Sequence, residues 1–182
     1  MKKEHLLIMR FSAIGDVAMM VPIVVALAEQ YPSLKITVLS RPFAKDFFSN
    51  LASNVYFMSA DVKNEYKGVG GLNELFKRVY SKNITCVADF HGVLRTEYLR
   101  SRFALNGVKV EHINKHRKGR RKLCRQKNKV MQQLASPFDN YSDVLRKLGY
   151  PIVLSQEKVP FASISSSFVV PKGEVWIGIA PG

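Results

Sequence analysis

HLLIMRFSAIGD, which runs from His5 to Asp16, carries the clearest fold signal in the chain. Its apolar part, Leu6–Phe11, predicts a buried strand, and the small residues that follow predict a loop. A helical pattern begins at Val17 and continues to Tyr31. In an open α/β sheet, ligands bind outside the carboxyl ends of the strands. The segment therefore places Asp16 where such a fold has its chemistry.

Strand-like and helix-like segments alternate along the chain, which is typical of an α/β fold with a doubly wound parallel sheet. The expected strands are Leu6–Phe11, Leu34–Leu39, Val55–Met58, Ile84–Phe90 and Val108–Ile113. The expected helices are Val17–Tyr31, Pro42–Asn50, Leu72–Tyr80, Leu94–Leu105 and one near Tyr141–Leu148. Pro22 lies inside the first helical pattern, so that helix either starts after Val17 or has a kinked first turn.

The order of elements predicts one domain followed by the start of another. Residues 1–162 form the Rossmann-like domain, and residues 163–173 are polar and bounded by prolines, like a linker. Residues 174–182 are expected to form the first strand of a second domain.

The charge of the chain is strongly basic and unevenly distributed. The 28 Lys and Arg residues stand against 14 Asp and Glu residues, which gives a net charge of +14. Between His91 and Gln133 there are 13 basic and two acidic residues, or 11 of the 14 net charges. A field this concentrated predicts an anionic partner such as phosphates, a membrane surface or nucleic acid.

Other features narrow the class of protein. No apolar run is long enough to span a bilayer, and the N-terminus lacks a signal-type segment, so we expect a cytoplasmic protein. Cys86 and Cys124 lie in different contexts without metal-ligand spacing, so neither a disulfide nor a metal site is expected. The first loop has neither the dinucleotide-binding nor the P-loop glycine pattern, so no cofactor site is expected.

Two strand ends carry candidate site residues. Asp16 lies at a helix start, where Asp is a good N-cap but could also take a proton from a hydroxyl nucleophile as a general base. Asp89 and His91 follow the fourth strand, so we expect them at the same sheet edge as Asp16. His91 is either a hydrogen-bonded loop histidine or a ligand contact. Arg95 lies in the next helix's first turn, where the helix dipole disfavours a cation, and this favours a binding role.

The densest charge is HRKGRRK, residues 116 to 122. This segment is either a solvated loop or a site for phosphates or carboxylates, which arginine holds with paired hydrogen bonds. Nucleic acid is the rival ligand, but no aromatic residue lies between positions 103 and 138 to stack on bases. We expect Arg117, Arg120 and Arg121 to hold an anion, and the segment Lys115–Lys129 to be mobile without one.

Four segments resemble, in the same order, the lipopolysaccharide heptosyltransferases of glycosyltransferase family nine. They are RFSAIGDVAMMVP (residues 10–22), ADFHGVLR (88–95), NYSDVLRKLG (140–149) and IGIAPG (177–182). The first resembles the family's opening strand, small-residue loop, Gly-Asp pair and later Pro. The second resembles a motif that reads Asp-Leu-Gln-Gly, with His91 in place of the Gln. The third resembles the helix that closes the first domain, and the fourth the first strand of the second domain.

The resemblance implies a GT-B enzyme with two Rossmann-like domains, of which this chain is the N-terminal, acceptor-side half. It implies inverting, metal-independent transfer of heptose or a related sugar from an ADP-sugar, held by the second domain, to a lipopolysaccharide inner-core acceptor. That acceptor is anionic and lipid-linked, and lies at the inner face of the cytoplasmic membrane. Asp16 matches the family's base, and Ser12, Gly15, His91 and Arg95 would line the acceptor side of the cleft. The 182-residue chain alone would then be inactive and bind ADP-sugar weakly.

The alternative is a non-catalytic Rossmann-like module that binds anions or RNA, in which Asp16 only caps a helix. The position of the basic segment distinguishes the two interpretations. If the chain belongs to an enzyme, the basic segment should flank the sheet edge that carries Asp16. We favour this interpretation and therefore expect no nucleic-acid partner.

Overall fold

The computed structural model describes residues 4–154, so the expected linker and second-domain strand lie outside the described residues. Five parallel strands form one sheet in the order β3-β2-β1-β4-β5. The strands are β1 (His5–Met9), β2 (Lys35–Ser40), β3 (Val55–Ser59), β4 (Cys86–Asp89) and β5 (Lys109–His112). The expected doubly wound parallel sheet is confirmed, and each strand lies within two residues of its predicted bounds.

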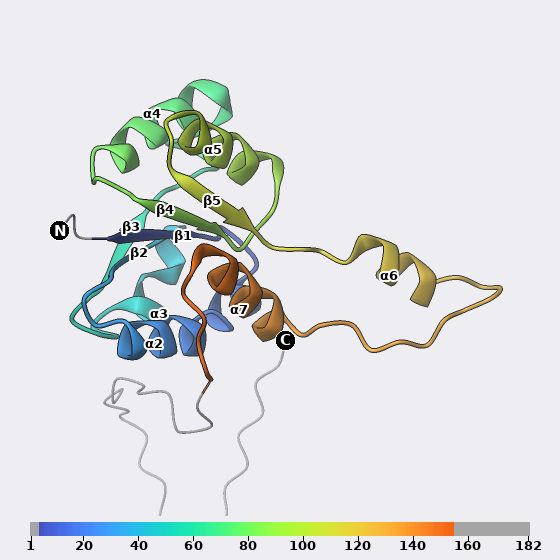
Figure 1. Ribbon diagram of the computed structural model, residues 1–182. Coiled ribbons are helices and arrows are strands. Elements are labelled where there is room, and N and C mark those ends of the chain that lie inside the picture. Colours follow the sequence, from blue (N-terminus) through green and yellow to red (C-terminus); the bar gives the residue numbers. More distant parts are fainter. Residues whose placement is uncertain (1–3, 155–182) are drawn as a thin grey trace, which may run out of the picture.

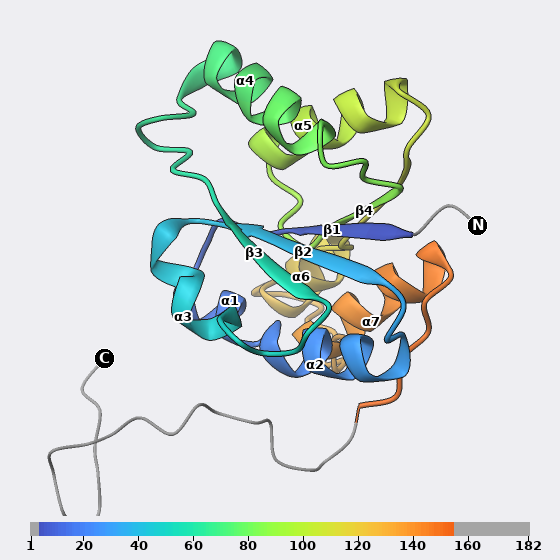
Figure 2. The ribbon, with the colours of Figure 1, turned by 90° about the vertical axis from the view of Figure 1, so that its left-hand side faces the viewer.

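Helices cover both faces of this sheet (Figures 1 and 2). Successive side chains of a strand point to opposite faces, so Leu6 and Ile8 of β1 pack into one core, and Leu7 and Met9 into the other. The helices over Leu7 and Met9 are α4 (Gly68–Tyr80) and α5 (Leu94–Leu105). The opposite layer contains α1 (Ile14–Ala18), α2 (Val21–Gln30), the 3₁₀ turn Pro42–Ala44, α3 (Lys45–Phe48) and α7 (Pro137–Leu148).

Two helix predictions need correction. The segment expected to form one helix over residues 17–31 forms α1, which already begins at Ile14, and α2, which begins at Val21 after a two-residue turn. Pro22 therefore lies in the first turn of α2, where its missing N–H breaks no helical hydrogen bond. α4 begins at Gly68 rather than after the glycine pair at positions 70–71.

The strand order reverses between β1 and β4. The chain runs from β1 to β2 and β3 on one side, and then returns to place β4 and β5 on the other side. This reversal is a topological switch point, where doubly wound folds bind their ligands. The loops that follow Met9 and Asp89 lie at this switch point, because these two residues are register partners.

Between β5 and α7 the chain extends away from the sheet as the basic arm, residues 114–135 (Figure 1). The arm contains α6 (Arg117–Leu123), a helix that the sequence pattern did not predict. Lys and Arg are good helix formers, so a short basic helix is compatible with the composition. The arm carries nine Lys and Arg residues, and no Asp or Glu occurs between His112 and Phe138.

Both cysteines are free, as expected, with Cys86 buried in β4 and Cys124 exposed at the end of α6. Within residues 4–154, none of the helices combines the length and the apolar character needed to cross a bilayer.

Candidate active site

The loops after β1 and β4 meet at the switch point, as predicted. Ser12 follows β1 and His91 follows β4, and the Ser12 hydroxyl lies within hydrogen-bond distance, 3.1 Å, of Nε2 of His91. Asp16 belongs to α1, the first helix after Ser12. The expected grouping of Asp16, Asp89 and His91 at one sheet edge is therefore confirmed.

Asp16 is not an N-cap, which corrects one of the two interpretations of this residue. Ala13 is the N-cap of α1, and Asp16 is the third helical residue, whose carboxylate accepts a hydrogen bond from the Ala13 N–H at 3.4 Å. The Asp16 side chain is 39% exposed, so solvent and a ligand can reach its carboxylate. An exposed, fixed carboxylate at a switch point has the geometry that a general base needs.

Arg10 holds Asp16 in place. The sequence analysis did not identify Arg10 as a site residue. Its side chain is 10% exposed, and its guanidinium forms an ion pair with the Asp16 carboxylate and donates to the Phe90 carbonyl. The guanidinium also lies 5.9 Å from the ring centroid of Tyr141 in α7, whose hydroxyl donates to the Asp16 carbonyl at 3.2 Å. The sequence did contain a signal for this role. Arg10 lies inside an apolar run, and a buried Arg requires a charged or polar partner nearby.

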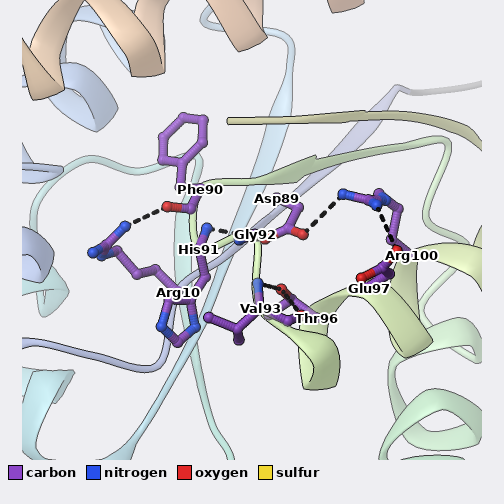
Figure 3. Close-up of polar contacts among 9 residues, drawn as sticks. All are labelled: Arg10, Asp89, Phe90, His91, Gly92, Val93, Thr96, Glu97 and Arg100. Carbon is purple, nitrogen blue, oxygen red and sulfur yellow. Dashed lines mark hydrogen bonds and ion pairs between the residues drawn. The ribbon is translucent and has the colours of Figure 1, made fainter. Parts of the chain in front are cut away.

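Asp89 shapes the turn after β4, and its carboxylate faces other groups of the protein (Figure 3). Its carboxylate is fully buried and accepts hydrogen bonds from the N–H groups of His91 and Gly92, both at 2.9 Å. Its second oxygen lies 3.3 Å from Arg100 of α5, which also approaches Glu97 at 3.9 Å. All of these contacts are internal, so Asp89 positions His91 rather than reacting itself.

His91 is a neutral imidazole in this setting. Burial, followed by the positive charge of Arg10, lowers the pKa of His91 to about 4. Its ring lies edge-on to Phe11, with 6.2 Å between the centroids. Its buried Nδ1 has no hydrogen-bond partner among the described residues. His91 therefore offers a neutral hydrogen-bonding group beside Ser12 at neutral pH.

The remaining predicted residues differ in how closely they join this cluster. Gly15 lies inside α1, and a Cβ there would meet nothing within 4 Å, so its backbone imposes no special requirement. Arg95 is exposed in the first turn of α5, and no hydrogen bond or ion pair connects its side chain to another described residue. Its proposed contact with a ligand stays a prediction.

The basic arm leaves the sheet at the same edge, as the enzyme interpretation requires. It begins directly after β5, whose last residue, His112, pairs with Asp89 of β4. Nε2 of His116 lies 2.7 Å from Oδ1 of Asn140, which ties the arm to α7. α6, the helix that contains Arg117, Arg120 and Arg121, therefore belongs to an arm that leaves the sheet at the edge that carries Asp16 (Figure 1).

No protein-family model and no curated protein matches the sequence. Solved structures do match its fold. A family-nine glycosyl transferase from Veillonella parvula has a TM-score of 0.60 at 18% identity, over 82% of this chain and 43% of that chain. E. coli heptosyltransferase WaaC with ADP has a TM-score of 0.56 at 16% identity, over 87% of this chain and 50% of that chain.

The chain therefore has a heptosyltransferase-like fold. WaaC with ADP-2-deoxy-2-fluoro heptose gives the same result, with a TM-score of 0.58 at 14% identity over 87% of this chain and 52% of that chain. This likeness confirms the expected Rossmann-like architecture of GT-B glycosyltransferases. The chain spans about half the length of these heptosyltransferase-like structures.

Proposed function

We propose that this chain is the acceptor-side domain of an inverting glycosyltransferase, with Asp16 as its general base. The observation that carries the proposal is the exposed Asp16 carboxylate, fixed by Arg10 at the switch point of a heptosyltransferase-like fold. The same carboxylate also neutralises the mostly buried Arg10, and its 39% exposure leaves it within reach of a ligand.

In the proposed reaction, Asp16 accepts the proton of an acceptor hydroxyl. The freed oxygen forms a bond to the anomeric carbon of the sugar, and the bond from that carbon to the diphosphate of the donor breaks. Attack opposite to the leaving group inverts the anomeric centre, and the nucleoside diphosphate departs with the bonding electrons. Ser12 and the neutral His91 contact the acceptor hydroxyls beside the reacting one.

The proposed donor is an ADP-sugar, with heptose or a related sugar as the group transferred, and no metal is required. The support is that the WaaC structures with this fold contain ADP or an ADP-heptose analogue. The proposed acceptor is an anionic, lipid-linked inner-core sugar of lipopolysaccharide. The support is the uncompensated positive charge of the basic arm beside the site.

An acceptor on a lipid anchor places the enzyme at the inner face of the cytoplasmic membrane. Each Lys or Arg near an anionic bilayer contributes about 1 kcal/mol of attraction. The basic arm, with nine such residues, supplies this attraction on the side where the acceptor would enter.

The proposal is tested by assaying the full-length gene product against a panel of nucleotide sugars, with deacylated inner-core lipopolysaccharide as acceptor. We expect acceptor-dependent release of ADP with an ADP-sugar and none with UDP- or GDP-sugars. Release of UDP or GDP would contradict the donor assignment. The absence of release with every donor, together with tight RNA binding, would support the binding-module alternative.

A further inference from the structure

Most of the buried polar atoms that lack a hydrogen-bond partner gather at the sheet edge that carries Asp16. Within residues 4–154, five buried side-chain nitrogen or oxygen atoms have no partner, and four of them lie at or within two residues of the ends of β1, β2 and β4. These four are Arg10 Nε, Ser40 Oγ, Arg41 Nε and His91 Nδ1. About 90% or more of buried polar groups in proteins are hydrogen-bonded, so such a cluster points to a polar group that the fold encloses there.

Arg10 and Ser40 occupy adjacent positions on the same face of the sheet. They follow Met9 and Leu39, which are register partners in β1 and β2, and the Arg10 N–H donates to the Leu39 carbonyl at 3.1 Å. Alternation along each strand places both side chains on the face that packs against α2 and α7. Neighbouring strands are about 4.8 Å apart, so the two side chains begin close together.

The other two unpartnered atoms do not share that face. Arg41 continues the extended backbone of β2 by one residue, so its side chain leaves from the opposite face. His91 packs its ring against Phe11, a residue of the opposite core. Arg10 Nε and Ser40 Oγ are therefore the pair that one small group can serve.

The two atoms of this pair are chemically complementary. The terminal nitrogens of Arg10 donate to the Phe90 carbonyl and the Asp16 carboxylate, which leaves its Nε–H as an unused donor among the described residues. Ser40 is fully buried, and its hydroxyl can both donate and accept. One water can accept from the Arg10 Nε–H and donate to the Ser40 hydroxyl. Both atoms are closed to solvent, which favours a trapped water over part of a substrate.

We infer that Ser40 is a positioning residue of the candidate site, because its hydroxyl holds a buried water against Arg10 Nε. The guanidinium is then fixed at all three of its nitrogens, by the Phe90 carbonyl, by Asp16 and by the water. Since this guanidinium pairs with Asp16, Ser40 orients the carboxylate without touching it. The inference rests on the proposed function only for the catalytic role of Asp16.

A crystal structure of the 182-residue chain tests the water itself. We expect one water within about 2.7–3.2 Å of both Arg10 Nε and Ser40 Oγ. Either a direct hydrogen bond between these two atoms or the absence of a shared water would overturn the inference.

Ser40→Ala distinguishes a partnered hydroxyl from an unpaired one by the sign of its effect on stability. Loss of an unpaired buried hydroxyl should stabilise the fold, because the cost of burying it disappears. Loss of a hydroxyl that holds a water should instead raise the equilibrium constant for unfolding, by about fivefold in chemical denaturation. A decrease in that constant would contradict the inference.

The Nε–H signal of Arg10 in ¹⁵N NMR spectra reports whether Ser40 acts through the guanidinium. Exchange of this proton with solvent should be about fivefold faster in Ser40→Ala, because one hydrogen bond that opposes local opening is lost. Thr37→Val is the matched control, since it also removes a buried hydroxyl from β2. That hydroxyl lies 2.8 Å from Nε2 of His5, three residues before Ser40 along the strand.

Thr37→Val should therefore destabilise the chain but leave the exchange of the Arg10 Nε–H unchanged. Equal acceleration in both variants would assign the effect to general loosening of the fold and would overturn the positioning role of Ser40.

Turnover of the full-length gene product separates this inference from the catalytic proposal. If Asp16 is the base, Ser40→Ala should lower kcat by about tenfold through misplacement of the carboxylate, with the KM for the donor nearly unchanged. Unchanged kcat together with faster exchange at Arg10 would contradict the catalytic role of Asp16 rather than the contact between Ser40 and Arg10.

Discussion

At the scale of single residues, Arg10 connects the segments that form the candidate site. It extends from the end of β1 to the Asp16 carboxylate, to the carbonyl after β4 and to the ring of Tyr141. Three segments far apart in the sequence are thereby held around one guanidinium. The position of Asp16 thus depends on a buried cation as well as on its own helix.

Replacing Arg10 tests this dependence. Arg10→Met should lower stability by about 1–2 kcal/mol, less than for a fully buried pair because Asp16 is partly exposed. It should also raise the pKa of His91 above about 4, because the charge of Arg10 is one cause of the depression. Chemical denaturation and NMR titration of the His91 ring check the two effects.

Arg10→Lys is the matched control, since it keeps the charge but loses the paired hydrogen bonds. It should keep the pKa of His91 low and recover only part of the stability. An unchanged His91 titration in Arg10→Met would contradict the charge coupling between the two side chains.

His91 gives a second prediction, on the pH dependence of folding. The pKa of His91 is about 4 in the folded chain and near 6.5 when unfolded, so the unfolded state binds more protons between these values. The stability contributed by neutral His91 is therefore present above pH 6.5 and is lost as the pH falls toward 4. His91→Gln should be less sensitive to acid over that window.

The comparison is the difference in unfolding free energy between wild type and His91→Gln at pH 7.5 and pH 5. Wild type should lose more stability than the variant on acidification. A parallel loss in both proteins would show that His91 titrates normally in the folded chain.

At the scale of elements, periodicity predicted the strands because β1, β2 and β4 are buried and strongly apolar. It could not predict the break between α1 and α2, since apolar residues continue through it and only Pro22 marked the place. The proximity of Ser12 and His91 could be predicted, because each follows a strand that ends at the same edge of the sheet. The burial of the Asp89 side chain could not be predicted from the sequence, because its direction depends on Arg100 of α5.

The anchoring of the basic arm is testable at this scale. His116 is the N-cap of α6 with a left-handed backbone, φ 47°, and its ring is hydrogen-bonded to Asn140. His116→Ala should lower the free energy of local opening of the arm by about 1 kcal/mol, which raises the equilibrium constant for opening roughly fivefold. Trypsin should then cleave within residues 115–129 about fivefold faster, while the melting temperature changes little.

Asn140→Ala removes the other side of the same hydrogen bond and should have a similar effect on cleavage. Unchanged cleavage in both variants would show that this contact does not hold the arm.

At the scale of the whole molecule, charge is segregated from the folded body. The sheet and its two helical layers carry most of the acids, whereas the arm carries nine basic residues and none of the opposite sign. The concentration of basic residues in the sequence was enough to predict an anionic partner. The structure adds that the arm leaves the sheet at the edge that carries Asp16, which sequence could not establish because it depends on the strand order.

This segregation predicts that the chain binds anionic membranes. Vesicles with 30% phosphatidylglycerol should sediment the chain at low ionic strength, with about 1 kcal/mol from each basic residue that nears the surface. Binding should weaken steeply as salt rises, because exposed charges are screened within about 8 Å at physiological ionic strength. Binding that is insensitive to salt would contradict an electrostatic attachment through the arm.

The most direct test of the catalytic proposal compares turnover and stability in Asp16→Asn of the full-length gene product. Asn can keep a hydrogen bond to Ala13 but cannot accept the acceptor proton at neutral pH. Turnover should fall by about 10²–10⁴-fold, the usual contribution of a general base. The free energy of unfolding should fall by about 1–2 kcal/mol, because Asn leaves the mostly buried Arg10 without its counter-charge while the Asp16 side chain is partly exposed. Near-normal turnover in the folded variant would contradict the assignment of Asp16 as the base.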